Sequence, residues 1–140
     1  MGTWDAGPFD NDAAADWCGD LHDAAPEQRI DMIREAFTAV VNHGSEDYLD
    51  SDIAVDAIAA AAIVAAQLPG GPAITSPYAP DFILEGGTVE VPDDLPALAI
   101  RALERIDGPN SEWPALWEDG YPKVVELQQP IRTALQRAAR

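Results

Sequence analysis

Apolar side chains recur at helical spacing along most of the chain, and each recurrence is bounded by residues that start or stop helices. Asparagine and aspartate before an alanine run predict a first helix over 12–22. A proline at a first helical position and a later glycine predict a second helix over 26–42. The same spacing predicts further helices over 50–68, 95–107, 111–118 and 122–138. The pattern therefore predicts an all-α bundle of five or six helices.

The helix expected over 50–68 differs from the others because it is apolar on nearly every face. One stripe runs through Ala57, Ala61 and Val64, and Ile58 and Ala62 occupy other faces. A helix without a polar face to turn toward water belongs inside a protein. We therefore expect this helix to be the centre of the bundle.

The connection over 69–92 has a different composition, with five prolines, four glycines and no helical period, so we expect no helix in it. Two short stretches, 82–85 and 88–91, flank Gly86-Gly87, a pattern typical of a two-residue hairpin turn. Pairing across this turn would set Leu84 opposite Val89 and create one apolar face. The sequence thus predicts a small β-hairpin over 82–91.

Length and charge limit the classes of protein to which the chain can belong. Its 140 residues suit one compact domain over 1–140 and leave too little for a second. Twenty-five acidic residues against eight basic ones give a formal net charge of −17, which repels phosphates. We therefore expect neither nucleic acids nor membranes as partners. The most apolar stretch, 57–66, is shorter than the ~20 residues that span a bilayer.

The cysteine content and the N-terminal sequence favour a reducing compartment. Cys18 is the single cysteine and cannot form an internal disulfide. No basic region followed by an apolar run opens the chain, so we expect no signal peptide and a cytoplasmic location. Abundant alanine, and a single lysine among the basic residues, are typical of a GC-rich bacterial genome.

A short motif with two aromatic residues precedes the first helix. Gly7-Pro8 is expected to turn the chain, and Trp4 and Phe9 to cover one end of the bundle. Asn11 or Asp12 is expected to cap the helix, a contribution of ~1 kcal/mol. These roles explain the motif without a ligand.

The alternative interpretation of this motif is a cation site, because hard cations prefer several oxygen ligands from a loop. Its ligands would be Asp5, Asp10, Asn11 and Asp12. The spacing lacks the glycine and the distal glutamate of an EF-hand loop. We therefore favour the structural role and expect no metal at this position.

Two parts of the chain carry motifs that extend beyond helix patterning. The first consists of Met1-Gly2-Thr3-Trp4, residues 7–12, Ala14 and Asp16-Trp17; the second consists of Ala102-Leu103, Asn110-Ser111-Glu112 and Leu116-Trp117. Together they resemble a bacterial family catalogued as a domain of unknown function, number 4259. That family commonly has glycine where this chain has Asp5. Because its activity is unknown, the resemblance implies a shared fold and lineage but no catalytic residue.

A thiol or zinc site is the first candidate for chemistry on the first helix. Cys18 and His22 stand four residues apart and share one face. The chain has neither the paired cysteines nor the HExxH helix of zinc sites. Carboxylates at Asp16, Asp20 and Asp23 would raise the pKa of the Cys18 thiol, which argues against a nucleophilic cysteine.

Carboxylate pairs and glycine pairs are the remaining candidates. Asp52 and Asp56 share a helix face and could act as a general acid and base, but we expect both on a solvated face, where neither is tuned for this role. Neither Gly70-Gly71 nor Gly86-Gly87 is followed by the lysine and hydroxyl residue of a phosphate-binding loop. We expect no nucleotide and no other cofactor.

The distribution of charge gives the functional prediction. Residues 1–56 hold fourteen acids against two arginines, whereas 127–140 hold three arginines and no acid. Such an acidic half can be a solvated surface only, or it can steer a basic partner, as immunity proteins and nucleic-acid mimics do. We predict a non-catalytic protein-interaction module that contacts a basic protein through Asp47, Asp50 and Asp52. The alternative is a metal-assisted enzyme that uses the N-terminal or third-helix carboxylates.

Overall fold

The computed structural model describes residues 12–44, 46–74 and 79–139, and within these ranges the chain forms helices and no sheet. The elements are α1 (Asp12–Asp23), α2 (Pro26–Val41), α3 (Ser51–Gln67), α4 (Asp81–Leu84), α5 (Leu95–Asp107), α6 (Glu112–Trp117), the 3-10 helix η1 (Glu118–Gly120) and α7 (Tyr121–Ala138). All six predicted helices are confirmed, with boundaries that agree to within one residue. The all-α fold class is therefore confirmed, and α4 is additional.

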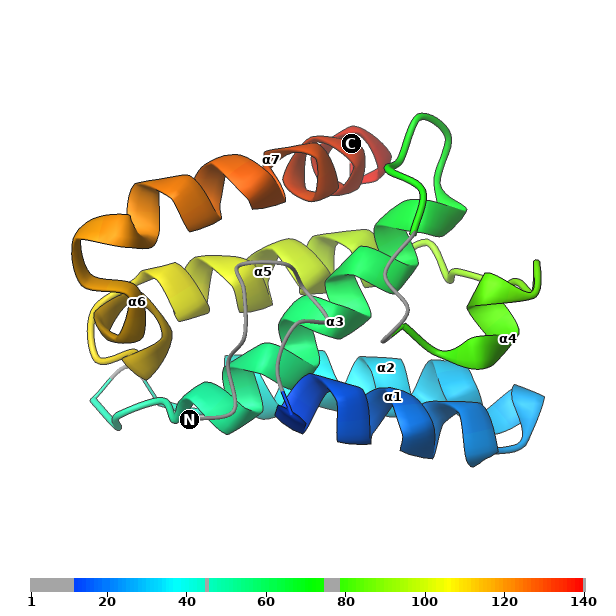
Figure 1. Cartoon of the computed structure of the whole chain (residues 1–140), viewed down its shortest axis with the longest axis horizontal. Coiled ribbons are helices and arrows are strands. Elements are labelled where there is room, and N and C mark those ends of the chain that lie inside the picture. Colours follow the sequence, from blue (N-terminus) through cyan, green and yellow to red (C-terminus); the bar gives the residue numbers. More distant parts are fainter. Residues whose placement is uncertain (1–11, 45, 75–78, 140) are drawn as a thin grey trace.

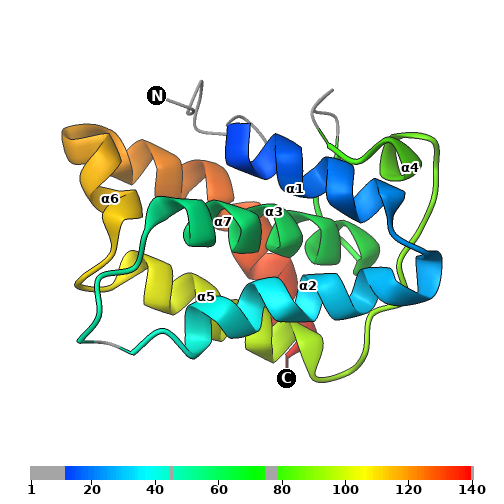
Figure 2. The same ribbon diagram turned by 90° about the horizontal axis from the view of Figure 1, so that it is seen from below.

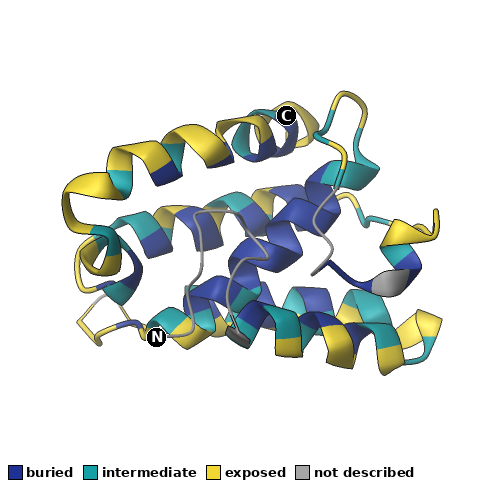
Figure 3. Cartoon of the chain, in the orientation of Figure 1, coloured by how far each residue is buried: buried dark blue, intermediate teal, exposed yellow. Residues whose placement is uncertain are grey.

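The prediction that the apolar helix is central is also confirmed. Helix α3 contacts α1, α2, α5, α6 and α7. Figure 1 shows it running diagonally between the α1–α2 pair and α7. Every residue from Ala57 to Ala65 is buried, and in Figure 3 the helix is dark blue over most of its length.

Each helix that surrounds α3 contributes a large apolar side chain to the core. Leu21, Phe37, Ile106, Trp113 and Leu135 come from five different helices, and all are almost completely buried. Burial of one such side chain contributes about 1.5–3 kcal/mol. The outer faces of these helices are exposed (Figure 3). None of the helices within the described ranges has both the length and the apolar character needed to cross a bilayer.

The β-hairpin predicted over 82–91 is wrong, and so is the expectation that this connection contains no helix. Residues 81–84 form the single turn α4, and 85–91 form no strand. Gly86 N–H donates to the Ile83 carbonyl (3.1 Å), and Gly87 N–H donates to the Phe82 carbonyl (2.7 Å). With Gly86 at φ +91°, these bonds match the Schellman ending of a helix. The glycine pair therefore ends a helical turn and does not reverse a hairpin.

Contacts with the α1–α2 corner hold α4 in its helical conformation. Phe82 N–H donates to Nδ1 of His22 (3.2 Å), and the two rings stack. The guanidinium of Arg29 lies 3.8 Å from the centre of the Phe82 ring. Arg29 also donates to the carbonyl groups of Leu21 (3.1 Å) and His22 (2.8 Å) at the end of α1. Because these partners come from distant parts of the sequence, the local pattern could not predict the turn.

Candidate functional site

The three predicted contact residues lie where the α2–α3 loop runs into α3. Asp47, Asp50 and Asp52 are all exposed, as is Glu46. We define residues 46–52 as the acidic segment. None of its carboxylates forms an ion pair with another residue that the structure describes.

Arg105 on α5 fixes the backbone around the acidic segment. Its guanidinium donates to five carbonyl groups at N···O distances from 2.7 to 3.4 Å, those of His43, Gly44, Asp47, Pro109 and Asn110. The side chain thereby ties the α2–α3 loop to the α5–α6 connection, which lies beside it in Figure 2. The guanidinium forms no ion pair with the carboxylates of the acidic segment.

Backbone pairing and a capping carboxylate add to this restraint. Leu49 N–H donates to the Asn110 carbonyl (2.8 Å), and Glu112 N–H donates to the Leu49 carbonyl (2.9 Å), which makes a parallel β-bridge. Glu112 Oε1 accepts from the N–H of Ser51 (2.8 Å), one of the free amides at the start of α3. The side chain of Asp50, the N-cap residue, makes no capping bond. Its carboxylate therefore remains available at the surface.

Tyr48 gives the acidic segment an exposed aromatic side chain. It is 54% exposed, and its carbonyl accepts from Nε2 of His43 (2.8 Å). Tyrosine is enriched in protein interfaces, and the face of its ring attracts ammonium and guanidinium groups. A restrained backbone that presents carboxylates beside an aromatic ring is suited to basic side chains.

A second group of carboxylates lies between α1 and α3. Oδ1 of Asp56 is buried and has no hydrogen-bond partner. Burial, followed by the charges of Asp52, Asp20 and Asp16, raises the pKa of Asp56 to about 7. Asp52 is exposed as expected, whereas Asp56 is half-buried and does not lie on a fully solvated face.

Cys18 lies close to this group on α1. Its side chain is buried, and burial together with the charge of Asp56 raises the pKa of the thiol to about 12. The predicted direction is confirmed, although burial and Asp56 cause the shift, not the aspartates of α1. At neutral pH the group is a thiol and not the reactive thiolate.

No cluster of metal-binding side chains lies within the described residues. Among 12–44, 46–74 and 79–139, no group of three or more histidine, cysteine, aspartate and glutamate side chains could hold a metal ion. Trp4, Asp5, Phe9, Asp10 and Asn11 lie outside the described residues. Asp12 is the first residue of α1. The covering, capping and cation-binding roles suggested for this motif remain predictions.

Sequence reasoning missed the roles of Arg105, Tyr48 and Glu112. Arg105 and Glu112 act on residues about sixty positions away, and no local spacing indicates such contacts. Tyr48 could have been noticed as an aromatic residue between Asp47 and Asp50. For Asp56 a signal existed, because it is the one charged residue in the otherwise apolar stretch from Ile53 to Ala66.

The chain belongs to the family described as domain of unknown function (DUF4259), whose model matches residues 2–130. The match spans the N-terminal motif and the helices as far as the middle of α7, so the resemblance seen in the sequence is confirmed. No curated protein and no solved structure is significantly similar to the chain. The description of this family carries no activity.

Proposed function

We propose that this member of the DUF4259 family is a non-catalytic protein-interaction module whose acidic segment docks on a basic partner protein. The observation that carries the proposal is the position of Arg105, which restrains the backbone of the segment and leaves its carboxylates unpaired. A surface held in place before binding loses less conformational entropy on association. Free carboxylates attract a basic partner and increase its association rate.

The use of the other basic side chains supports this proposal. In the described part of the chain only Arg34 and Arg132 form ion pairs with carboxylates, each with an N···O distance of 2.5 Å, to Asp94 and Asp107 respectively. Arg29 donates to backbone carbonyl groups, as Arg105 does. Most carboxylates in this part of the chain therefore have no ion-pair partner among the described residues. This potential suits an immunity-like or mimic-like role, in which an acidic surface meets a toxin or a nucleic-acid-binding protein.

The metal-assisted enzyme suggested as the alternative gains no support from the described carboxylates. Asp52 and Asp56 lie on one helix with Asp16 and Asp20 near them, but these groups are not arranged to hold a metal ion. The interaction module is therefore the function we put forward.

A triple variant in which asparagine replaces Asp47, Asp50 and Asp52 tests the proposal. Its matched control replaces Glu85, Glu104 and Glu126 with glutamine, which removes the same charge from exposed positions elsewhere. Affinity capture from the source cell with the parent and the control should enrich the same basic protein. The triple variant should lose that protein while melting at the parent temperature. Equal capture by all three proteins, or capture of acidic partners only, would overturn the proposal.

A further inference from the structure

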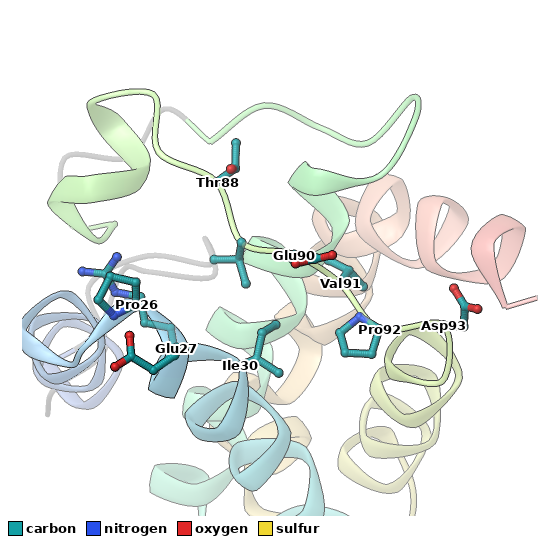
Figure 4. A pocket seen from close by; sticks show the side chains of 10 residues that line it. Pro26, Glu27, Ile30, Thr88, Glu90, Val91, Pro92 and Asp93 are labelled. Carbon is teal, nitrogen blue, oxygen red and sulfur yellow. The ribbon is translucent and has the colours of Figure 1, made fainter.

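A groove of about 620 Å³ lies between the start of α2 and the segment 88–93, as Figure 4 shows. Pro26, Glu27, Arg29 and Ile30 line it on the α2 side, and residues 88–93 form the other wall. The groove lies near the C-terminal end of α3, whereas the acidic segment leads into the N-terminal end. The two surfaces are therefore separate.

The groove has an acidic rim. Glu27, Glu90 and Asp93 are exposed, and none of them forms an ion pair with another described residue. Arg29 is the one cation among the lining residues, and it is engaged by two carbonyl groups of α1 and by the ring of Phe82. The charge of the groove therefore favours a cationic ligand.

The segment 88–93 also presents backbone groups that have no partner. Val89 is buried, and its N–H donates to Oε1 of Gln67 at the end of α3 (3.2 Å), which anchors the segment. Figure 4 shows the segment following an extended path beside α2. Successive amides of an extended chain point to opposite sides, so the N–H of Glu90 points away from Gln67. The N–H groups of Thr88 and Glu90, which share that edge, donate to no residue that the structure describes.

We propose that this groove binds an extended basic segment of a partner protein, which pairs with the backbone of Thr88 and Glu90. Addition of a strand to an open edge is a common form of peptide recognition, in which backbone bonds give affinity and alternate side chains give specificity. Lysine or arginine side chains of the partner would lie against Glu27 and Glu90. Their aliphatic stems would pack on Ile30. The proposal does not depend on the acidic segment.

The probe is a capped peptide of about eight residues, close to the length of a strand, with lysine at alternate positions and threonine or valine between them. A second peptide carries glutamate in place of lysine. A third keeps the lysines but is N-methylated at alternate backbone positions, so it retains its charge and loses donors on one edge. Calorimetric titration at low salt should show saturable binding of the lysine peptide. N-methylation should weaken that binding about tenfold, and the glutamate peptide should not bind.

The protein variants locate the binding. A double variant in which glutamine replaces both Glu27 and Glu90 should bind the lysine peptide about tenfold more weakly than the parent. The triple variant of the acidic segment should bind this peptide as tightly as the parent does. All variants are compared at equal folded fraction, checked by thermal melting. The reverse pattern would overturn the groove proposal and leave the proposed function standing.

Other occupants are separate outcomes of the same experiment. If spermidine displaces the lysine peptide and N-methylation has no effect, the groove attracts cations by charge alone and the extended-segment proposal is wrong. If the protein alone dimerises and the Glu27→Gln, Glu90→Gln variant does not, the occupant is a second copy of this chain, which also overturns it. If the lysine peptide shows no saturable binding, the extended-segment proposal is also overturned.

Discussion

Glu112 accepts a hydrogen bond from the backbone N–H of Ser51 at 2.8 Å, so a carboxylate on α6 caps α3 from a distance of sixty-one residues in the sequence. The capping carboxylate satisfies a free amide and also lies at the positive end of the helix dipole. The side chain of the N-cap residue, Asp50, makes no capping bond of its own. One carboxylate is therefore structural, and its neighbour is free for a partner.

Glu112→Ala should lower the free energy of unfolding by about 0.5–2 kcal/mol, because it removes the cap of the central helix. Glu112→Gln keeps an oxygen acceptor, so its free energy of unfolding should fall by less than that of Glu112→Ala. Urea denaturation of the two variants beside Glu126→Ala, at an exposed position on α7, measures the difference. Equal stability of the alanine variant and the parent would show that solvent caps α3 as well as Glu112 does.

Arg105→Lys should loosen the acidic segment without unfolding the bundle. A single ammonium group cannot reach the five carbonyl groups that the planar guanidinium serves. Native-state hydrogen exchange should accelerate at the Leu49 amide, which bonds to the α5–α6 connection, while amides within α3 remain protected. Arg101→Lys, at an exposed position on the same helix, is the control. Unchanged exchange at Leu49 would mean that the β-bridge alone holds the segment.

Asp56 should make stability depend on pH. Its pKa is about 7 in the folded protein, chiefly through burial, against ~3.9 in an unfolded chain. The folded state therefore binds the proton more tightly, and the resulting stabilisation is complete below about pH 4 and is lost as the pH rises through about 7.

Asp56→Asn cannot ionise, so it should exceed the parent in unfolding free energy by about 1–3 kcal/mol at pH 8 and match it at pH 4. Asp47→Asn, at an exposed position, controls for the loss of one negative charge. Denaturant titrations across this range test the prediction. A difference that does not change with pH would show that Asp56 is solvated in the folded protein.

The helices could be predicted because their determinants are local. The proline at the start of α2 and Gly108 after α5 mark the ends of helices to which they are adjacent in the sequence. The apolar positions recur within each helix. The central place of α3 followed from the same pattern, since a helix without a polar face has to be buried. Helix α4 could not be predicted, because its turn depends on His22 and Arg29. The restraint on the acidic segment was hidden for the same reason, since Arg105 and Asp47 are 58 residues apart.

Gly87 distinguishes the ending of α4 from the hairpin that the sequence suggested. A Cβ at Gly87 would lie 2.5 Å from the Phe82 carbonyl oxygen, a distance at which the backbone has to shift. In a two-residue hairpin turn the same position would have room for a side chain, at the cost of a positive φ. Gly87→Ala should therefore break the bond from its N–H to Phe82 and release α4 from the α1–α2 corner.

The expected loss for Gly87→Ala is about 1–3 kcal/mol in unfolding free energy, the range for a strained backbone position. Gly120→Ala is the matched control, because a Cβ there meets nothing within 4 Å and no positive φ is required. Stacking of His22 on Phe82 gives a second readout, since the His22 ring resonances should shift in Gly87→Ala and not in the control. If both alanine variants melt together and the His22 resonances stay in place, the Schellman ending is not what holds α4, and the contacts of Arg29 and His22 with Phe82 suffice to fix the turn.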